Sequence, residues 1–311
     1  MQKLNKKKRK KRKTNLSLLT KSLCLFCQTQ GEFLYSISSF NLPFKVHLCP
    51  SCGLIYQNPM PNPETIQNLY QEGYYSGKAC FSYEDERKLE KYSAFVWKAR
   101  VKKLKKSLKI HDSSPRFLDI GCAFGGLLKE AQNSHFTSYG VELSDYSRTE
   151  AEKFFKDRVF KDFLQAPFKE NFFDAISMIE VIEHLHNPLE YLQKSYQILK
   201  KGGVLLVQTA NMEARQAKKA KEKYHYFLPG HLVYFSKKNL RNKLLELGFS
   251  KVKIFHPVEF GLLPKLKKSK GSFTSLKDYF KWFKIAFYHF KSKLYFKDRC
   301  FTSSMVVYAW K

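Results

Sequence analysis

The sequence predicts an α/β protein with a doubly wound, mostly parallel seven-stranded sheet, preceded by a small four-cysteine module. From Arg116 onward, strand-like and helix-like stretches alternate, and this alternation is typical of a parallel sheet covered by helices. Nearer the start of the chain, four of the seven cysteines fall into two C-x-x-C pairs. Such pairs favour a metal site over disulfides.

Seven apolar stretches are expected to form the sheet, and helical patterns separate most of them. The expected strands are residues 116–121, 138–143, 159–163, 172–181, 204–209, 251–257 and 304–311. One helix is expected to begin with Asn187 as its cap and Pro188 as its first residue, and to end at Lys201-Gly202-Gly203. Further helices are expected at 145–156 and 236–249, and a helical segment within 64–110.

The first expected strand runs into a glycine-rich loop, D119-I-G121-C-A-F-G125-G126, which opens a helix. Glycines let the backbone approach a ligand closely, and a helix N-terminus favours an anionic group. Glu142 follows the second strand, where an acid can bind both hydroxyls of a ribose. These features fit a nicotinamide dinucleotide as well as S-adenosylmethionine (SAM), although Ala123 stands where the dinucleotide fingerprint has glycine.

Four stretches in series resemble class I SAM-dependent methyltransferases, notably the bacterial ubiquinone-biosynthesis O-methyltransferases. They are FLDIGCAFGGLL, GVELSDYS, FFDAISMIEVIEHLHNPLEYL and ILKKGGVLLVQTAN, within about residues 115–250. The resemblance implies a Rossmann-like domain. It places Asp119, Gly121 and Gly125 at the methionine end of SAM, Glu142 at the ribose, Asp162 and Phe163 at the adenine, and Met178, Ile179 and Glu180 along the pocket.

Two histidines are candidates for the base that a hydroxyl or acidic-carbon acceptor requires. His184 follows the fourth strand, and His231 lies in the stretch that borders the acceptor pocket in this family. Together with Glu180 and Glu183, they also resemble the Glu/Glu/His/His metal site of small-RNA 2′-O-methyltransferases. That set suits a divalent cation. A third interpretation is that these histidines are structural.

Cys24, Cys27, Cys49 and Cys52 follow the pattern C-x2-C-x21-C-x2-C, which predicts a closed, structural zinc site of the ribbon type. A module of about 35 residues has too little core to fold unaided, so zinc would supply its stability. The stretch that follows, through 57–63 to the L-Y-x-x-x-Y-Y segment, resembles methyltransferases associated with surface polysaccharides or lipids. This resemblance implies a glycan or lipid-linked acceptor.

The net charge of +29 is concentrated in two segments. Residues 1–13 hold nine Lys/Arg and no acid, and residues 265–299 hold eleven Lys/Arg against Asp278 and Asp298. Within the second segment, residues 275–296 form an amphipathic helical pattern that fits an anionic membrane surface, a lid over the acceptor pocket, or a helix packed on the domain. RNA is a further partner that the charge allows.

The expected organisation is a disordered basic tail, a zinc-ribbon-like module, a linker with a helical segment, and a methyltransferase domain with a basic aromatic insertion. These span residues 1–20, 21–60, 61–112 and 113–311, with the insertion at 265–299. The expected function is methylation of a small molecule, glycan or lipid-linked precursor. The alternatives are an RNA methyltransferase and a non-catalytic binding protein. Reduced cysteines and the lack of a signal peptide favour a cytoplasmic protein, with contact to the inner face of the membrane through 275–296 as an option.

Overall fold

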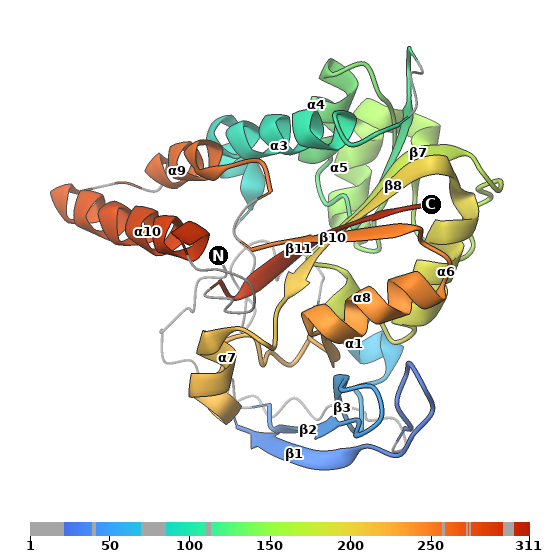
Figure 1. Ribbon diagram of the computed structural model, residues 1–311. Helices are drawn as coiled ribbons and strands as arrows, with labels where there is room; N and C mark the ends of the chain where they lie inside the picture. The colour runs from blue at the N-terminus through green and yellow to red at the C-terminus, as the bar shows by residue number, and fades with distance from the viewer. Residues whose placement is uncertain are drawn as a thin grey trace.

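A seven-stranded sheet forms the centre of the chain, seen in a computed structural model that describes residues 22–38, 42–69, 85–109, 113–256, 259–271, 273, 275–294 and 302–311 (Figure 1). The strand order is β10–β11–β8–β7–β4–β5–β6. In chain order the strands are β4 (Arg116–Ile120), β5 (Thr137–Val141), β6 (Val159–Phe160), β7 (Phe173–Ile179), β8 (Leu199–Ala210), β10 (Lys251–Phe255) and β11 (Ser304–Trp310). Only the pairs β10–β11 and β11–β8 are antiparallel. The predicted mostly parallel seven-stranded sheet is confirmed.

Helices cover both faces of this sheet, as a doubly wound fold requires. One face carries α3 (Glu90–Lys105), α4 (Gly126–Asn133) and α5 (Asp145–Phe155), and the other carries α6 (Pro188–Ile198) and α8 (Lys237–Glu246) (Figure 1). Alternate residues of β8 divide between the two cores: Val204 and Leu206 face α3–α5, whereas Leu205 and Val207 face α6 and α8. Both faces are apolar because both are buried.

The boundary between α6 and β8 differs from the expected one. Asn187 and Pro188 do begin α6, but the helix ends at Ile198, and the two glycines expected to stop it lie inside β8. Gly202 adopts a positive φ of 78°, and a Cβ on Gly203 would lie only 2.8 Å from the carbonyl oxygen of Lys200. These glycines therefore allow the irregular backbone with which β8 begins.

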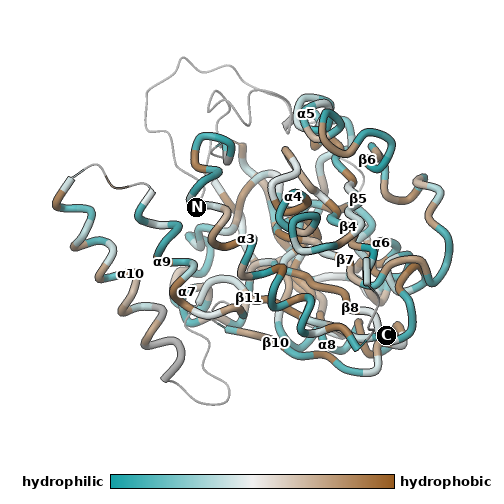
Figure 2. The backbone as a smooth tube through the Cα atoms, turned by 90° about the horizontal axis from the view of Figure 1, so that it is seen from above, coloured by the Kyte–Doolittle hydropathy of each residue, from teal (hydrophilic) through white to brown (hydrophobic). Residues whose placement is uncertain are grey.

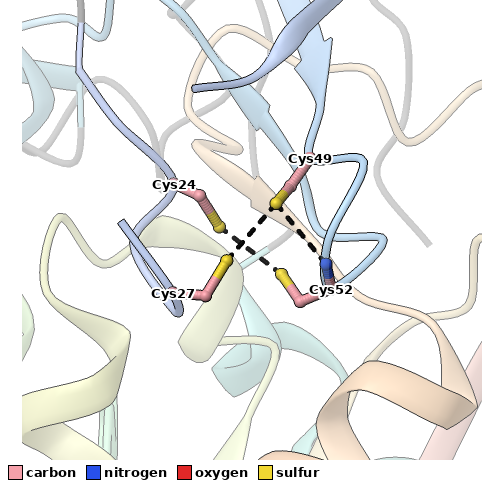
Figure 3. A group of neighbouring side chains, drawn as sticks. All are labelled: Cys24, Cys27, Cys49 and Cys52. Atoms are coloured by element: carbon pink, nitrogen blue, oxygen red, sulfur yellow. Dashed lines mark hydrogen bonds between the residues drawn. The ribbon is translucent and has the colours of Figure 1, made fainter. Parts of the chain in front are cut away.

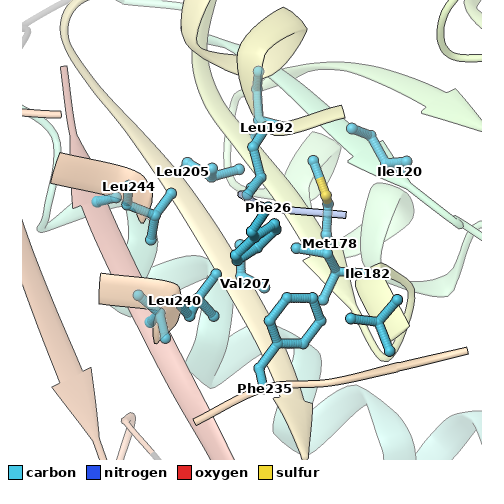
Figure 4. Packing of buried hydrophobic residues seen from close by; sticks show 14 of the residues in the cluster. Phe26, Ile120, Met178, Ile182, Leu192, Leu205, Val207, Phe235, Leu240 and Leu244 are labelled. Atoms are coloured by element: carbon cyan, nitrogen blue, oxygen red, sulfur yellow. The ribbon is translucent and has the colours of Figure 1, made fainter. Parts of the chain in front are cut away.

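The N-terminal module is joined to the body, the part of the chain that carries the seven-stranded sheet, through a shared second sheet and a shared core. β1 (Glu32–Ile37), β2 (Phe44–Leu48) and β3 (Ile55–Gln57) form an antiparallel sheet, and its fourth strand is β9 (Val233–Tyr234) from the body. Phe26 of the module inserts among body residues that include Leu192, Val207 and Phe235 (Figure 4). Shorter helical elements elsewhere in the chain are α1 (Pro63–Leu69), η2 (Glu86–Leu89), η3 (Lys156–Arg158), η4 (Ile182–His184), α7 (Arg215–Ala220) and η5 (Lys221–Lys223).

A helical arm formed by α9 (Leu262–Lys270) and α10 (Leu276–Leu294) extends away from the sheet (Figures 1 and 2). The amphipathic helix predicted at 275–296 is confirmed as α10, while α9 was not anticipated. The expected basic tail at 1–20 and the end of the insertion at 295–299 lie outside the described residues. Among the helices described here, none is long and apolar enough to cross a bilayer.

Candidate functional site

The glycine loop lies at the carboxyl edge of the parallel strands, between β4 and α4. Gly121 and Gly125 have φ values of 78° and 80°, a left-handed conformation that side chains disfavour. Ala123 also has a positive φ, 47°, which carries backbone strain in a residue with a Cβ. The loop passes close to its neighbours, since a Cβ on Gly121 would lie 2.4 Å from Cγ2 of Val181. Sequence and geometry thus agree on a tight loop at this edge.

Glu142 connects this loop to the neighbouring one. It follows β5, and its Oε2 accepts a hydrogen bond from the backbone N–H of Ala123 at 2.8 Å. Its Oε1 accepts from the backbone N–H of Ser144, also at 2.8 Å. Burial raises the pKa of Glu142, and the two N–H donors oppose that shift. The carboxylate is therefore held in one orientation by the loops after β4 and β5.

The remaining predicted cofactor residues occupy different environments. Asp119 is buried, and its Oδ1 accepts from Oγ of Ser177 at 2.5 Å, so β7 fixes its side chain. Oδ1 of Asp162 accepts the backbone N–H groups of Leu164 and Gln165, which shapes the turn after β6. Phe163 is fully buried beside Tyr191, with ring centroids 5.0 Å apart. Its ring supports this turn from the core side, while the predicted contact with adenine stays a prediction.

Glu180 ends a buried chain of polar contacts. It comes directly after Ile179, the last residue of β7, and has a positive φ of 56°. Its Oε1 accepts from Nε2 of Gln208 at 2.7 Å, and Oε1 of Gln208 accepts from Arg100 at 2.5 Å. Arg100 also donates from Nε to Oε1 of Glu259 at 2.6 Å. The chain links α3 and the segment before α9 to the edge of the candidate pocket.

The two candidate catalytic histidines lie together although 47 positions separate them in the sequence. Their ring centroids are 4.7 Å apart. Nδ1 of His184 lies 2.8 Å from the carbonyl oxygen of Gly230, and Nδ1 of His231 lies 2.8 Å from that of Tyr226. Because a carbonyl only accepts, Nδ1 of His231 carries the proton and donates to Tyr226, which places its ring lone pair on Nε2, whereas the ring of His184 is hydrogen-bonded to the backbone of both Gly230 and Glu180. Burial lowers the pKa of His184 to about 4 and that of His231 well below its ordinary value. Both imidazoles are neutral near pH 7.

Glu183 completes this cluster. Its Oε2 accepts from Oγ1 of Thr209 at 2.9 Å, and its Oε1 is buried without a donor among the described residues. Burial, with the nearby charge of Glu180, raises the pKa of Glu183 well above its ordinary value. The potential ligand atoms of Glu183, His184 and His231 lie within 4.8 Å of one another. Three of the four side chains of the predicted Glu180, Glu183, His184 and His231 set are thus grouped, and Glu180 is not among them.

Gln57 of the module fixes the loop that carries His231. The side chain is buried, and its Nε2 donates to the carbonyl oxygens of His231 at 2.8 Å and Pro229 at 3.1 Å. Its backbone N–H donates to Leu232 at 2.8 Å. Leu232 in turn donates to the carbonyl of Glu183 at 2.7 Å. A residue at the end of β3 therefore holds both parts of the histidine cluster.

The four predicted metal-binding cysteines come together in two matching turns (Figure 3). The backbone N–H of Gln28 donates to Cys24, and in the second turn that of Gly53 donates to Cys49. Gln28 and Gly53 both have positive φ, 58° and 71°. Backbone N–H groups also lie 3.5 Å from Sγ of Cys24 and of Cys49. The two turns are the knuckles that the C-x-x-C spacing predicts.

The sulfur positions fit a tetrahedral ion. Sγ of Cys24 lies 3.5 Å from Sγ of Cys52, and Sγ of Cys27 lies 3.4 Å from Sγ of Cys49. In a tetrahedral site with Zn–S distances of about 2.3 Å, neighbouring sulfur atoms lie about 3.8 Å apart. Burial raises the pKa of Cys24 to about 11, so a bound cation is what would hold this thiol as a thiolate near pH 7. The donor set therefore suits Zn²⁺.

Comparison with known proteins identifies the family. A sequence profile described as a methyltransferase domain matches residues 89–254, slightly more than half of the chain. This chain belongs to that family of methyltransferase domains. The match spans α3, the glycine loop, Glu142 and the histidine cluster, so it contains the site described above. The predicted membership is confirmed.

Individual relatives of this methyltransferase domain match over shorter stretches. Cycloartenol-C-24-methyltransferase 1 of Oryza sativa subsp. japonica is 31% identical over 96 residues, 28% of this chain and 28% of that protein. The ubiquinone biosynthesis O-methyltransferase of Xylella fastidiosa (strain M23) is 33% identical over 118 residues, 34% of this chain and 46% of that protein. The matches thus span less than half of either relative. A solved SAM-dependent methyltransferase from Archaeoglobus fulgidus has a TM-score of 0.48 at 20% identity, covering 71% of this chain and 97% of that one.

Several residues of this methyltransferase domain and its attached module were not predicted from the sequence. They are Gln57, Arg100, Ser177, Gln208, Thr209 and Glu259, each of which holds a predicted site residue or its neighbour. Four of them sit in strands, where the sequence pattern shows only buried positions. A polar residue within a buried strand was the one available signal, because such a residue needs a partner.

Proposed function

We propose that this chain transfers the methyl group of SAM to an oxygen or carbon atom of a small-molecule acceptor. The observation that carries the proposal is the position of Glu142, which accepts backbone N–H groups from the loops after β4 and β5. A carboxylate fixed there can accept hydrogen bonds from both hydroxyls of the SAM ribose. Membership of the methyltransferase family supports the same conclusion.

The cofactor, when bound, supplies an electrophilic methyl group, and the protein must hold and orient the acceptor. In our proposal the loop at Gly121 and Gly125 receives the methionine end, with Asp119 beneath it, and the turn at Asp162 borders the adenine. His184 and His231 are neutral, and His231 keeps its ring lone pair on Nε2, so this pair can accept an acceptor proton as a general base. The carbonyls of Gly230 and Tyr226 would stabilise the imidazolium that results.

A divalent cation at the same cluster is a second candidate, supported by the buried, donor-free Oε1 of Glu183. Two imidazoles with Nδ1 hydrogen-bonded to carbonyls, beside a carboxylate, suit Mn²⁺, Mg²⁺ or Zn²⁺. Glu183, His184 and His231 would hold the ion, with Glu180 beside them. The ion would lower the pKa of an acceptor hydroxyl. Dependence on an added cation, with the four cysteines still loaded with zinc, separates the two roles, because a base needs no metal.

The names of the relatives suggest the kind of acceptor. One relative is named for the C-24 position of cycloartenol and another for O-methylation in ubiquinone biosynthesis. Both names concern small molecules, which favours such an acceptor here over RNA. A glycan or lipid-linked precursor is our proposal within that class, based on the sequence around the module. We also propose that Cys24, Cys27, Cys49 and Cys52 bind one structural Zn²⁺.

Methyl transfer from labelled SAM to separate lipid-linked glycan, small-molecule and RNA fractions tests the proposal. We expect label in a small-molecule or lipid-linked fraction. Glu142→Gln should lower transfer about 10- to 100-fold, because an amide N–H₂ would face a backbone N–H and lose a charged hydrogen bond. Glu246→Gln, at an exposed position of α8, is the matched control.

The same assay distinguishes the base from the metal. If the histidines act as bases, protein with one zinc ion per chain, held by the four cysteines, is fully active without added Mn²⁺, and His231→Asn loses about 100-fold. If a further cation is required, the same protein is inactive until Mn²⁺ is added. Label that enters only RNA would contradict the proposed acceptor class, and a folded protein that transfers no label would contradict methyl transfer itself.

A further inference from the structure

α10 leaves a row of large apolar side chains uncovered. Leu276, Phe280, Phe283, Phe287 and Phe290 recur at intervals of three and four residues, so they share one face of the helix. Their exposed fractions range from 52% for Phe290 to 82% for Leu276. Single exposed apolar residues are ordinary, but a continuous row of four phenylalanines indicates a contact surface.

Among the residues that the structure describes, those that hold α10 lie away from this row. α10 is held through another side, where Nε1 of Trp282 donates to the carbonyl of Leu266 in α9 at 3.1 Å. At about 100° per residue, Trp282 lies roughly 120° around the helix from the apolar row. α9 in turn packs on α3, with Nζ of Lys267 5.3 Å from the ring centroid of Phe95. Both views show α10 beyond the body, with no sheet beneath it (Figures 1 and 2).

Positive charge borders the apolar row along one side. Lys277, Lys281 and Lys284 are exposed and fall at roughly 80–140° from Leu276 around the helix. Across residues 262–294 the sequence has nine lysines and a single acid, Asp278. Asp278 is already paired with Lys281, with Nζ and Oδ1 2.9 Å apart. The surface thus combines an apolar row with a strongly positive edge.

This combination identifies one kind of occupant. A second copy of the chain could cover the phenylalanines, but it would bring another arm with the same excess of lysines, and the like charges would repel. An anionic lipid surface is complementary to both features, because the lysines can contact phosphate headgroups while the phenylalanines insert at the boundary between headgroups and acyl chains. The helix is too polar to span a bilayer, so it would lie in the surface plane.

We propose that α10 docks the protein on anionic phospholipid membranes, with the row from Leu276 to Phe290 inserted and the lysine edge at the headgroups. The inference goes beyond methyl transfer and does not depend on it. It gives the basic arm a role that the methyltransferase family does not supply. It would also hold a protein that modifies lipid-linked molecules near its acceptor.

Flotation of the full chain with vesicles of phosphatidylcholine, alone or with about one third phosphatidylglycerol, tests this proposal. We expect binding to the anionic vesicles only. Phe283→Ser with Phe287→Ser should reduce the bound fraction at least about tenfold, because insertion strength scales with buried apolar area. Phe33→Ser, at a 59% exposed site on β1 and away from the arm, should leave binding unchanged (Figure 1).

Charge variants separate specific docking from general attraction. Lys277→Glu with Lys281→Glu and Lys284→Glu should also abolish binding, whereas Lys218→Glu with Lys219→Glu and Lys223→Glu, an equal change on α7 and η5, should retain most of it. Residues 1–13 are basic too, so they could attract anionic vesicles by charge alone. If the double Phe variant floats like the wild type, binding is purely electrostatic and the proposal is wrong. A concentration-dependent dimer that this variant loses, without vesicle binding, would also overturn it.

Discussion

The cysteine module and the α9–α10 arm both extend the methyltransferase body, but the module buries a phenylalanine in the body and the arm exposes its phenylalanines to solvent. Phe26 of the module is 6% exposed and lies in the main core, whereas Phe283 of the arm is 63% exposed. The module also gives β3 to a shared sheet and Gln57 to the histidine loop. An appended segment that buries its apolar residues in the body supports the site, and one that exposes them offers a surface to a partner.

Of the changes that test this comparison, loss of a zinc ligand should have the largest effect on stability. Cys24→Ser is expected to lower the free energy of unfolding by more than about 4 kcal/mol, because metal loss removes the module's main support. Bound zinc, measured by mass spectrometry, should fall from about one ion per chain. Cys80→Ser, outside the two C-x-x-C pairs, is the control. A Cys24→Ser protein with full zinc content would contradict the proposed site.

Truncation of Phe26 should come next. Phe26→Ala is expected to cost about 3–5 kcal/mol, because it opens a cavity where module and body meet. Phe33→Ala, in the same module but exposed, should change stability by less than about 0.5 kcal/mol. Chemical denaturation of both variants measures the difference. Equal, small costs would mean that the module is not part of the core.

Removal of the Gln57 amide should have an intermediate effect on stability and should also lower the rate of methyl transfer. Gln57→Leu leaves the carbonyls of His231 and Pro229 without this donor, a cost of about 1–3 kcal/mol. Because the His231 loop would shift while Glu142 stays in place, kcat should fall and the affinity for SAM should not. A variant that loses affinity and kcat together would indicate general damage.

The arm should give the smallest change in stability. Phe283→Ser with Phe287→Ser is expected to alter the free energy of unfolding by less than about 0.5 kcal/mol, since both rings face solvent. Thermal unfolding without lipid measures this. A large loss of stability would show that the phenylalanines pack within the protein, and the contrast with Phe26 would disappear.

The sequence predicted what local patterns encode. Strand and helix alternation gave the sheet, and the spacing of Gly121 to Glu142 located the loops that the Glu142 carboxylate joins. The C-x-x-C pairs predicted two similar turns, and the structure has equivalent hydrogen bonds at equivalent positions of both.

Long-range partners were not predictable in the same way. The pairing of β3 with β9 and the contact between Arg100 and Glu259 join positions 159 or more residues apart, and no local period reports them. The glycines at 202 and 203 were misread because a helix stop and an irregular strand start both use glycine. The histidine cluster was anticipated only through resemblance, and its support by Gln57 needed the fold.

Calorimetric titration of the purified full chain with SAM tests the central claim most directly. The account predicts saturable binding of one SAM per chain, weakened about 10- to 100-fold by Glu142→Gln and unchanged by Glu246→Gln. A folded wild-type chain that releases no heat with SAM but binds a nicotinamide dinucleotide, with Glu142→Gln abolishing that binding, would contradict it.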